Sequence, residues 1–119
     1  MPQIPISELA DFGTRIFSAA GAPPEIALRV SVALVQSDTY GVQSHGTNLL
    51  PQYITMIHNG RIKPTALSTT VKENAVTALV DGNFGFGHVT GEYATRIVGR
   101  VVLVPDPLGG GVSRHAFLP

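Results

Sequence analysis

The stretch Asp38-Thr-Tyr-Gly-Val-Gln-Ser-His-Gly-Thr-Asn-Leu-Leu-Pro-Gln-Tyr53 decides how this chain is organised. Apolar residues at helical spacing lie on both sides of it, which predicts a junction between two helices. Gly41 and Gly46 bracket Ser44-His45 at this junction, and glycine takes backbone conformations that other residues resist. An imidazole beside a hydroxyl can act as a general acid or base, because it changes protonation state near neutral pH. The alternative interpretation is that Ser44 caps the next helix and His45 is an ordinary surface histidine.

Helical spacing predicts three helices within the first 60 residues. Ser7 is the expected N-cap of the first helix, and Gly21 fits its C-terminal cap. Pro24 suits the first turn of the second helix. The third is expected from about Thr47 to Asn59, with Gly60 ending it. The side chains expected on the buried faces are Leu9, Phe12, Ile16, Ile26, Val30, Leu34, Leu50, Tyr53 and Ile57.

From Leu67 the apolar period changes and β-branched residues become frequent. Two such runs, 68–71 and 76–80, flank Asn74 and predict an antiparallel hairpin laid beside the helices. A further helix is expected over residues 89–102, with Val89, Tyr93, Ile97 and Val101 directed inward. Proline and glycine are frequent in residues 105–119, so that segment is expected to form an irregular tail. The predicted fold class is therefore α+β.

The run Gly85-Phe-Gly-His-Val-Thr-Gly91 invites a dinucleotide-binding interpretation. Its spacing misses the GxGxxG fingerprint by one residue, and no βαβ unit surrounds it, so a loop that leads into a helix is favoured. His88 would then lie near the helix N-terminus, where a positive charge is disfavoured. The four histidines show no pairing at three or four residues apart and the chain has no cysteine, so no metal site is expected.

Composition narrows the class of protein further. The 119 residues carry a formal net charge of zero, which indicates no electrostatic attraction to nucleic acid or to membranes. The absence of cysteine excludes a disulfide framework. No signal peptide is visible, and no apolar run approaches the length of a membrane span. We therefore expect one small cytoplasmic domain.

Several motifs recur at the spacing of a known family. They are Asp38, Gly41, Ser44-His45-Gly46, Leu50-Pro51, Tyr53, Gly60-Arg61-Ile62-Lys63-Pro64, Val80-Asp81-Gly82 and Gly85-Phe86-Gly87. Over about residues 7 to 100 the chain resembles the type 2 malate/L-lactate dehydrogenases. That family includes ureidoglycolate dehydrogenase, diketogulonate reductase and sulfolactate dehydrogenase. It is unrelated to the lactate dehydrogenases of the Rossmann type.

The resemblance implies a chemistry and a set of site residues. Members transfer a hydride between NAD or NADP and a small 2-hydroxy or 2-oxo acid. His45 matches the family's acid–base histidine, Ser44 would orient it or bond the substrate, and Tyr53 would line the substrate pocket. Many members have an arginine for the substrate carboxylate where this chain has Leu49, so malate, lactate and ureidoglycolate stay open as substrates. The cofactor-binding residues are unknown, and members are homodimers.

The resemblance also implies a division of the chain. Residues 1–66 correspond to the N-terminal helical domain and residues 67–104 to the start of the nicotinamide-binding domain. Residues 105–119 form a tail in which Leu118 stands at the position of a second family histidine. Family members are longer, so we expect a truncated or frameshifted copy that is nearly inactive alone. The alternative is a non-catalytic helical fragment that acts only as a subunit-interaction module.

Overall fold

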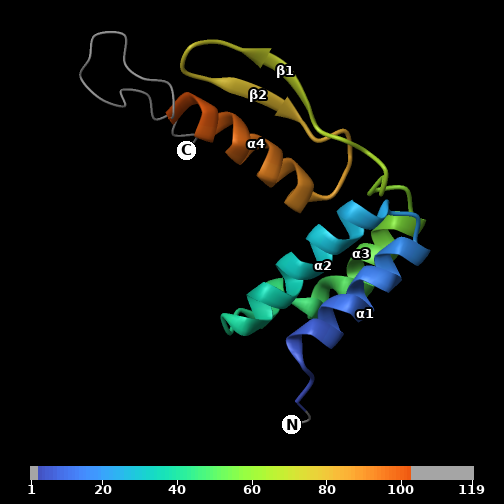
Figure 1. The fold of residues 1–119 in the computed structure, drawn as a ribbon. Coiled ribbons are helices and arrows are strands. Elements are labelled where there is room, and N and C mark those ends of the chain that lie inside the picture. The colour runs from blue at the N-terminus through green and yellow to red at the C-terminus, as the bar shows by residue number, and fades with distance from the viewer. Residues whose placement is uncertain (1–2, 103–119) are drawn as a thin grey trace.

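The computed structural model describes residues 3–102 of the chain, with side chains as far as Val98. The described elements run in the order α1 (Ile6–Ala19), α2 (Pro24–Thr39), two short 3₁₀ turns (Gln43–His45 and Thr47–Leu49), α3 (Leu50–His58), β1 (Thr69–Glu73), β2 (Ala78–Asp81) and α4 (Gly87–Val102). Figure 1 shows α1, α2 and α3 gathered in one part of the molecule and the hairpin lying along α4 in another. The predicted α+β class is confirmed.

The helix ends agree with the sequence signals, with one exception. Gly21 ends α1 with φ of +105°, a backbone conformation that suits glycine, and α2 begins at Pro24 as expected. Ser7 is not the N-cap of α1, so this prediction was wrong. The helix already begins at Ile6, because the carbonyl of Pro5 accepts a hydrogen bond from the backbone N–H of Leu9 at 3.1 Å.

Two small residues set how closely α1 and α2 pack. Ser31 is buried in α2, and its hydroxyl donates a 2.6 Å hydrogen bond to the carbonyl oxygen of Ala10 in α1. A Cβ atom on Gly13 would overlap the Ser31 hydroxyl, so glycine is required for this approach. Phe17, one turn beyond Gly13, is fully buried. The face of α1 that carries Gly13 and Phe17 is therefore the face that packs against α2.

This orientation corrects the predicted core of α1. Phe12 is 51% exposed, and Leu9 and Ile16 are only half-buried. The physical reason is the contact at Gly13. It rotates α1 about its own axis, by about the angle between successive helical residues, away from the face that its largest apolar side chains indicate. Of the other side chains expected in the core, the three from α2 are buried and those from the third helix are partly buried. These six are Ile26, Val30, Leu34, Leu50, Tyr53 and Ile57.

The predicted hairpin is confirmed. Strand β1 pairs antiparallel with β2, with Thr69 opposite Asp81 and Thr70 opposite Val80, and the register shifts after Thr70. Asn74 forms the turn, because its Oδ1 atom accepts hydrogen bonds from the backbone N–H groups of residues 76 and 77 at 2.9 and 2.8 Å. No helix in the described part of the chain is both long and apolar enough to cross a membrane.

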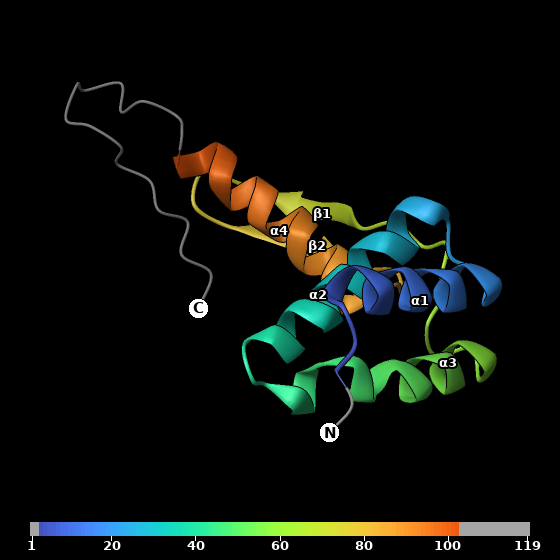
Figure 2. The ribbon, with the colours of Figure 1, turned by 60° about the horizontal axis from the view of Figure 1, so that its bottom comes forward.

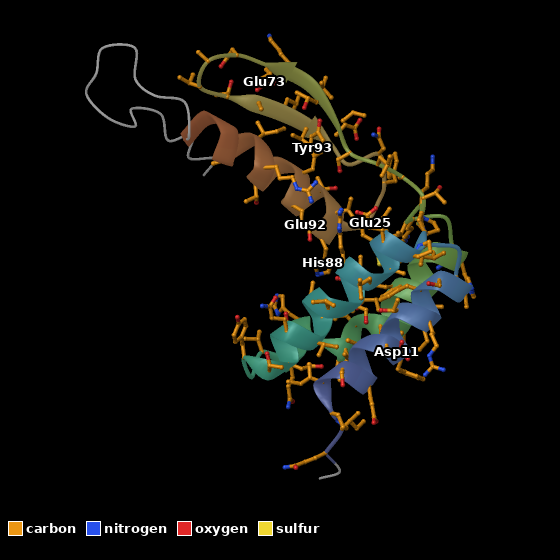
Figure 3. The ribbon with its side chains drawn as sticks, viewed as in Figure 1. Asp11, Glu25, Glu73, His88, Glu92 and Tyr93 are labelled. Carbon is orange, nitrogen blue, oxygen red and sulfur yellow. The ribbon has the colours of Figure 1, made fainter. Side chains whose placement is uncertain are left out.

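Helix α4 joins the hairpin to the other helices. Phe86, just before α4, is buried, and its ring meets that of Phe17 edge-on at 5.5 Å between centroids. On the hairpin side, the hydroxyls of Thr70 and Tyr93 lie 2.8 Å apart, and Ser68 donates to Thr90 at 3.2 Å. Figure 3 shows Tyr93 on the side of α4 that is nearest the hairpin. Val89 and Ile97 are buried and Tyr93 is partly buried, as expected, whereas the side chain of Val101 lies outside the described residues.

Candidate acid–base site

Ser44 and His45 form a hydrogen-bonded pair in the 3₁₀ turn Gln43–His45, between α2 and α3. The Ser44 Oγ atom lies 2.9 Å from Nδ1 of His45, and both side chains are exposed. The donor depends on which ring nitrogen carries the proton, but in either case Nδ1 is engaged by the hydroxyl. Nε2 has no hydrogen-bond partner among the described residues, so it is available to exchange a proton with a bound molecule.

The alternative role of Ser44 as a helix cap is not what the structure shows. The second 3₁₀ turn and α3 begin after Gly46 and Leu49, and neither has a side-chain cap. The turn is instead held by its own backbone, with the N–H of His45 donating to the carbonyl of Val42 at 3.1 Å. The Ser44 hydroxyl is therefore directed to the imidazole. That His45 lies at the surface agrees with both interpretations.

Asp38, in the last turn of α2, fixes the other side of the Ser44-His45 turn. Its Oδ2 atom accepts hydrogen bonds from the hydroxyl of Thr47 at 2.6 Å and from the backbone N–H of Thr47 at 3.2 Å. A Cβ atom on Gly46 would overlap Oδ1 of the same carboxylate. The sequence placed Asp38 in the family pattern without a role, because no local signal links residues nine apart across a turn.

Tyr53 lies in an aromatic cluster and makes no described contact with the Ser44-His45 pair. Its ring centroid is 6.4 Å from those of Phe17 and Phe86 and 6.0 Å from that of His88. Burial raises the pKa of the Tyr53 phenol, so it stays neutral and able to donate a hydrogen bond. The described contacts thus join Ser44 to His45 and Tyr53 to His88, and none joins the two pairs.

His88 is the second histidine with a distinct environment. It is half-buried in the first turn of α4, and burial lowers its pKa while the nearby Glu92 carboxylate opposes that effect. Figure 3 places both side chains on the side of α4 towards α2. The sequence anticipated a disfavoured charge here from the helix dipole alone; the association with Tyr53 depends on packing between distant segments, which no local pattern reveals.

In the glycine loop before α4 the chain itself encloses Gly85, whereas Gly87 and Gly91 have open space around them. A Cβ atom on Gly85 would lie 3.1 Å from the carbonyl oxygens of Ala66 and Gly82. The N–H of Gly85 already donates to the Gly82 carbonyl at 2.9 Å. At Gly85 the chain itself therefore occupies the space and uses the N–H donor that a phosphate would need. Within the described residues, no three His, Asp or Glu side chains gather as metal ligands.

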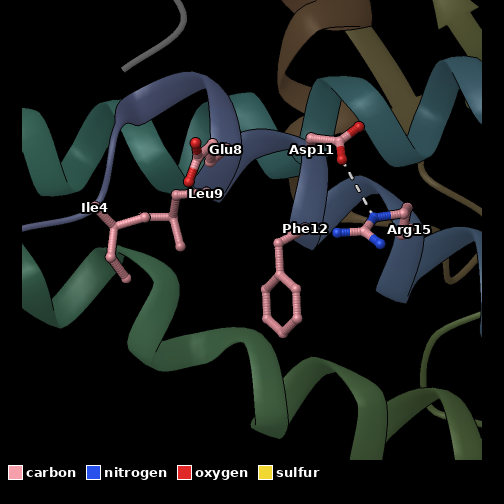
Figure 4. Close-up of a pocket in the computed structure, with 6 residues that line it drawn as sticks. All are labelled: Ile4, Glu8, Leu9, Asp11, Phe12 and Arg15. Carbon is pink, nitrogen blue, oxygen red and sulfur yellow. Dashed lines mark ion pairs between the residues drawn. The ribbon is translucent and has the colours of Figure 1, made fainter.

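Two of the surface hollows in the described part of the chain have linings that do not include the Ser44-His45 pair. The larger, of about 460 Å³, runs along the exposed face of α1 and is shown in Figure 4 with the Asp11–Arg15 ion pair at its rim. Apolar side chains of Ile4, Leu9 and Phe12 line much of it. The smaller, of about 190 Å³, lies between α2 and α4. Neither hollow is lined by Ser44, His45 or Tyr53.

The fold and the Ser44-His45 pair together define an α+β chain with an exposed, hydrogen-bonded serine–histidine pair at a helix junction. The sequence profile described as malate/L-lactate dehydrogenase matches residues 4–101. The chain belongs to this family of oxidoreductases.

Individual relatives agree with this assignment. Malate dehydrogenase of Pyrococcus abyssi is 35% identical over 95 residues, which cover 80% of this chain and 26% of that protein. L-sulfolactate dehydrogenase of Methanocaldococcus jannaschii is 39% identical over 77 residues, 65% of this chain and 22% of that protein. The structure of malate dehydrogenase from Pyrococcus horikoshii OT3 superimposes with a TM-score of 0.79 and 30% identity, over 83% of this chain and 28% of that one. The chain spans about a quarter of the length of these relatives.

Proposed function

We propose that this chain supplies the acid–base group of an NAD- or NADP-dependent dehydrogenase that interconverts small 2-hydroxy and 2-oxo acids. The observation that carries the proposal is the Ser44–His45 hydrogen bond, which engages Nδ1 at 2.9 Å and leaves Nε2 free. During reduction, protonated His45 donates its Nε2 proton to the carbonyl oxygen as negative charge develops there. During oxidation, the neutral imidazole accepts that proton from the hydroxyl. The nicotinamide cofactor, when bound, supplies or accepts the hydride.

The neighbouring residues support this role of His45. Ser44 orients the imidazole, and Asp38 holds the backbone on the far side of the turn through Thr47. Leu49 is half-buried and packs against the core, so the substrate carboxylate requires a cation from another position. Tyr53 fits a substrate-binding role as a neutral hydrogen-bond donor whose ring lies beside that of His88.

We also propose that residues 1–66 form the acid–base domain, that residues 67–104 begin the nicotinamide-binding domain, and that residues 1–119 alone do not turn over substrate. The support is that the N–H of Gly85 in the glycine loop already donates to the carbonyl of Gly82 and is not available to a diphosphate. Positioning of the reacting groups can be worth about 7–11 kcal/mol, and an acid–base residue without a positioned cofactor lacks that contribution.

The test is a chimera in which residues 4–101 replace the corresponding segment of the Pyrococcus abyssi malate dehydrogenase. The chimera is expected to oxidise NADH or NADPH with a 2-oxo acid, and residues 1–119 alone are not. His45→Ala in the chimera should lower kcat by about 10²- to 10⁴-fold with little change in cofactor affinity. His58→Ala, at the exposed end of α3, is the matched control and should leave kcat unchanged.

Two results would contradict the proposal. One is a His45→Ala chimera as active as its parent, which is the result expected if this region only pairs subunits. The other is rapid NADH oxidation by residues 1–119 alone, which would show that they hold and position the cofactor themselves.

A further inference from the structure

Phe84 adopts a backbone conformation that is unfavourable for its side chain. Its φ is +62° and that of Asn83 is +53°, and the N–H of Gly85 donates to the carbonyl of Gly82 at 2.9 Å. Two central residues with positive φ define a type I′ turn, which favours Asn followed by Gly. Asn83 suits its position, whereas a bulky residue in the left-handed region is a true outlier. Residues held in such conformations cluster at functional sites.

The surroundings account for the backbone conformation of the turn but not for the presence of a phenyl ring at position 84. Asn83 donates from its side chain to the carbonyl of Leu67 at 2.7 Å, and the N–H of Lys63 donates to the carbonyl of Phe84 at 2.8 Å. These hydrogen bonds need the backbone of residue 84 and would form equally well with glycine there. The Phe84 side chain is 72% exposed, so core packing does not account for it either.

A cation lies beside this exposed ring. The Nζ atom of Lys63 is 5.6 Å from the ring centroid of Phe84, within the range of a cation–π contact. Lys63 is itself exposed and forms no ion pair within residues 3–98. The exposed ring, with an ammonium group over it that forms no ion pair within the described residues, is complementary to a planar aromatic ring that carries an anionic group.

We propose that Phe84 and Lys63 form a nucleotide-binding site, in which the base stacks on the phenyl ring and the ammonium group binds the phosphate. Bases stack on aromatic side chains with little dependence on sequence, and lysine binds phosphate as a point charge. The nicotinamide cofactor of the proposed function is itself a nucleotide. The proposal therefore rests on the proposed function only for the identity of the nucleotide that binds. It does not depend on His45.

The test is titration of residues 1–119 with AMP, adenosine and inorganic phosphate, with NMR detection of the Phe84 ring and the Lys63 amide. AMP is expected to shift both signals and to bind more tightly than adenosine or phosphate. Phe84→Gly should weaken AMP binding by roughly 5- to 150-fold, the range that corresponds to one stacked base. The same substitution should raise Tm, because glycine adopts a positive φ without strain. A Phe84→Gly variant that is more stable than the parent but binds AMP more weakly is the result that identifies the site.

Two further variants separate the parts of the site. Lys63→Gln should reduce AMP binding to the level of adenosine. Phe12→Ala, which removes an exposed phenylalanine from α1, is the matched control and should leave AMP binding unchanged.

The proposal is overturned if AMP leaves the Phe84 ring signals unmoved, if Phe84→Gly binds AMP like the parent, or if phosphate alone binds as tightly as AMP. The proposed function has a separate readout, kcat of the His45→Ala chimera, so the failure of one proposal can be told from the failure of the other.

Discussion

The helices α1 to α3 and the hairpin with α4 are held together by different kinds of contact. Between the helices, large apolar side chains are fully buried, with Phe17, Val30 and Leu34 at the centre. The hairpin meets α4 largely through hydroxyl groups, and its Val71 and Leu79 side chains are exposed. Figure 2 shows the same division from another side, with the hairpin beside α4 and away from α3. The helical part thus carries its own apolar core, whereas the hairpin depends on α4 and on Phe86 for attachment.

The largest expected effect is in the helical core. Phe17→Ala should lower the free energy of unfolding by about 3–5 kcal/mol, because it empties the centre of the aromatic cluster. Phe12→Ala, five residues earlier in the same helix, should cost much less because Phe12 is exposed. Denaturant unfolding of both variants measures the difference. Equal losses of unfolding free energy in the two variants would mean that α1 packs against the core with the face that carries its largest apolar side chains.

Two glycine substitutions compare the turn that carries His45 with helix α4. Gly46→Ala should destabilise by about 1–3 kcal/mol, because the added methyl group displaces the Asp38 carboxylate from Thr47. Gly91→Ala, in the open interior of α4, should stabilise by roughly 0.5–1 kcal/mol, since glycine weakens a helix and nothing obstructs the methyl group. Thermal unfolding should therefore move Tm in opposite directions. Shifts of the same sign would contradict the contact at Asp38.

The hydroxyl contacts of the hairpin should contribute less. Tyr93→Phe removes the hydrogen bond to Thr70 and should cost about 0.5–1.5 kcal/mol. Hydrogen exchange should show faster opening of the β1 and β2 amides while the α1 and α2 amides keep their protection. Equally faster amide exchange in the helices and in the hairpin would show that the two parts unfold as one unit. Their different contacts would then give no difference in local stability.

The smallest expected effect depends on pH. Burial lowers the pKa of His88 from its ordinary value of 6.5, so below that pH the unfolded chain binds more protons than the folded chain. Stability should therefore be full above about pH 6.5 and decrease as pH falls towards the lowered pKa. His88→Gln should flatten this slope between pH 7 and pH 5 in denaturant titrations. If the slope of stability against pH is unchanged in the variant, or has the opposite sign, a group other than His88 causes the pH dependence.

The sequence predicted the elements well because their signals are local. Pro24, Gly21 and Gly60 mark helix ends through their own backbone preferences, and Asn74 marks the hairpin turn. The rotation of α1 was not predictable in this way, because it depends on a glycine of α1 meeting a serine of α2 across the interface. Phe86 illustrates the same limit, since it reads as part of a glycine loop and proves to be a buried anchor.

For the candidate acid–base site, the sequence indicated the residues, and the structure adds the contacts between them. Ser44 and His45 are neighbours in the chain, so their pairing could be anticipated. The association of Tyr53 with His88 depends on how α3 and α4 pack. The role of Asp38 depends on the path of the turn, which no periodicity describes.

The fit between Gly46 and the Asp38 carboxylate has a consequence for how this sequence can diverge. Because a Cβ atom at position 46 would overlap Oδ1, a side chain at that position requires the Asp38 carboxylate to be displaced or lost. Loss of the carboxylate first removes both hydrogen bonds to Thr47 and loosens the turn that carries His45. Either order passes through a weakened intermediate, so the two positions are expected to be inherited as a pair, and paired change at 38 and 46 would mark lineages in which this turn has been rebuilt.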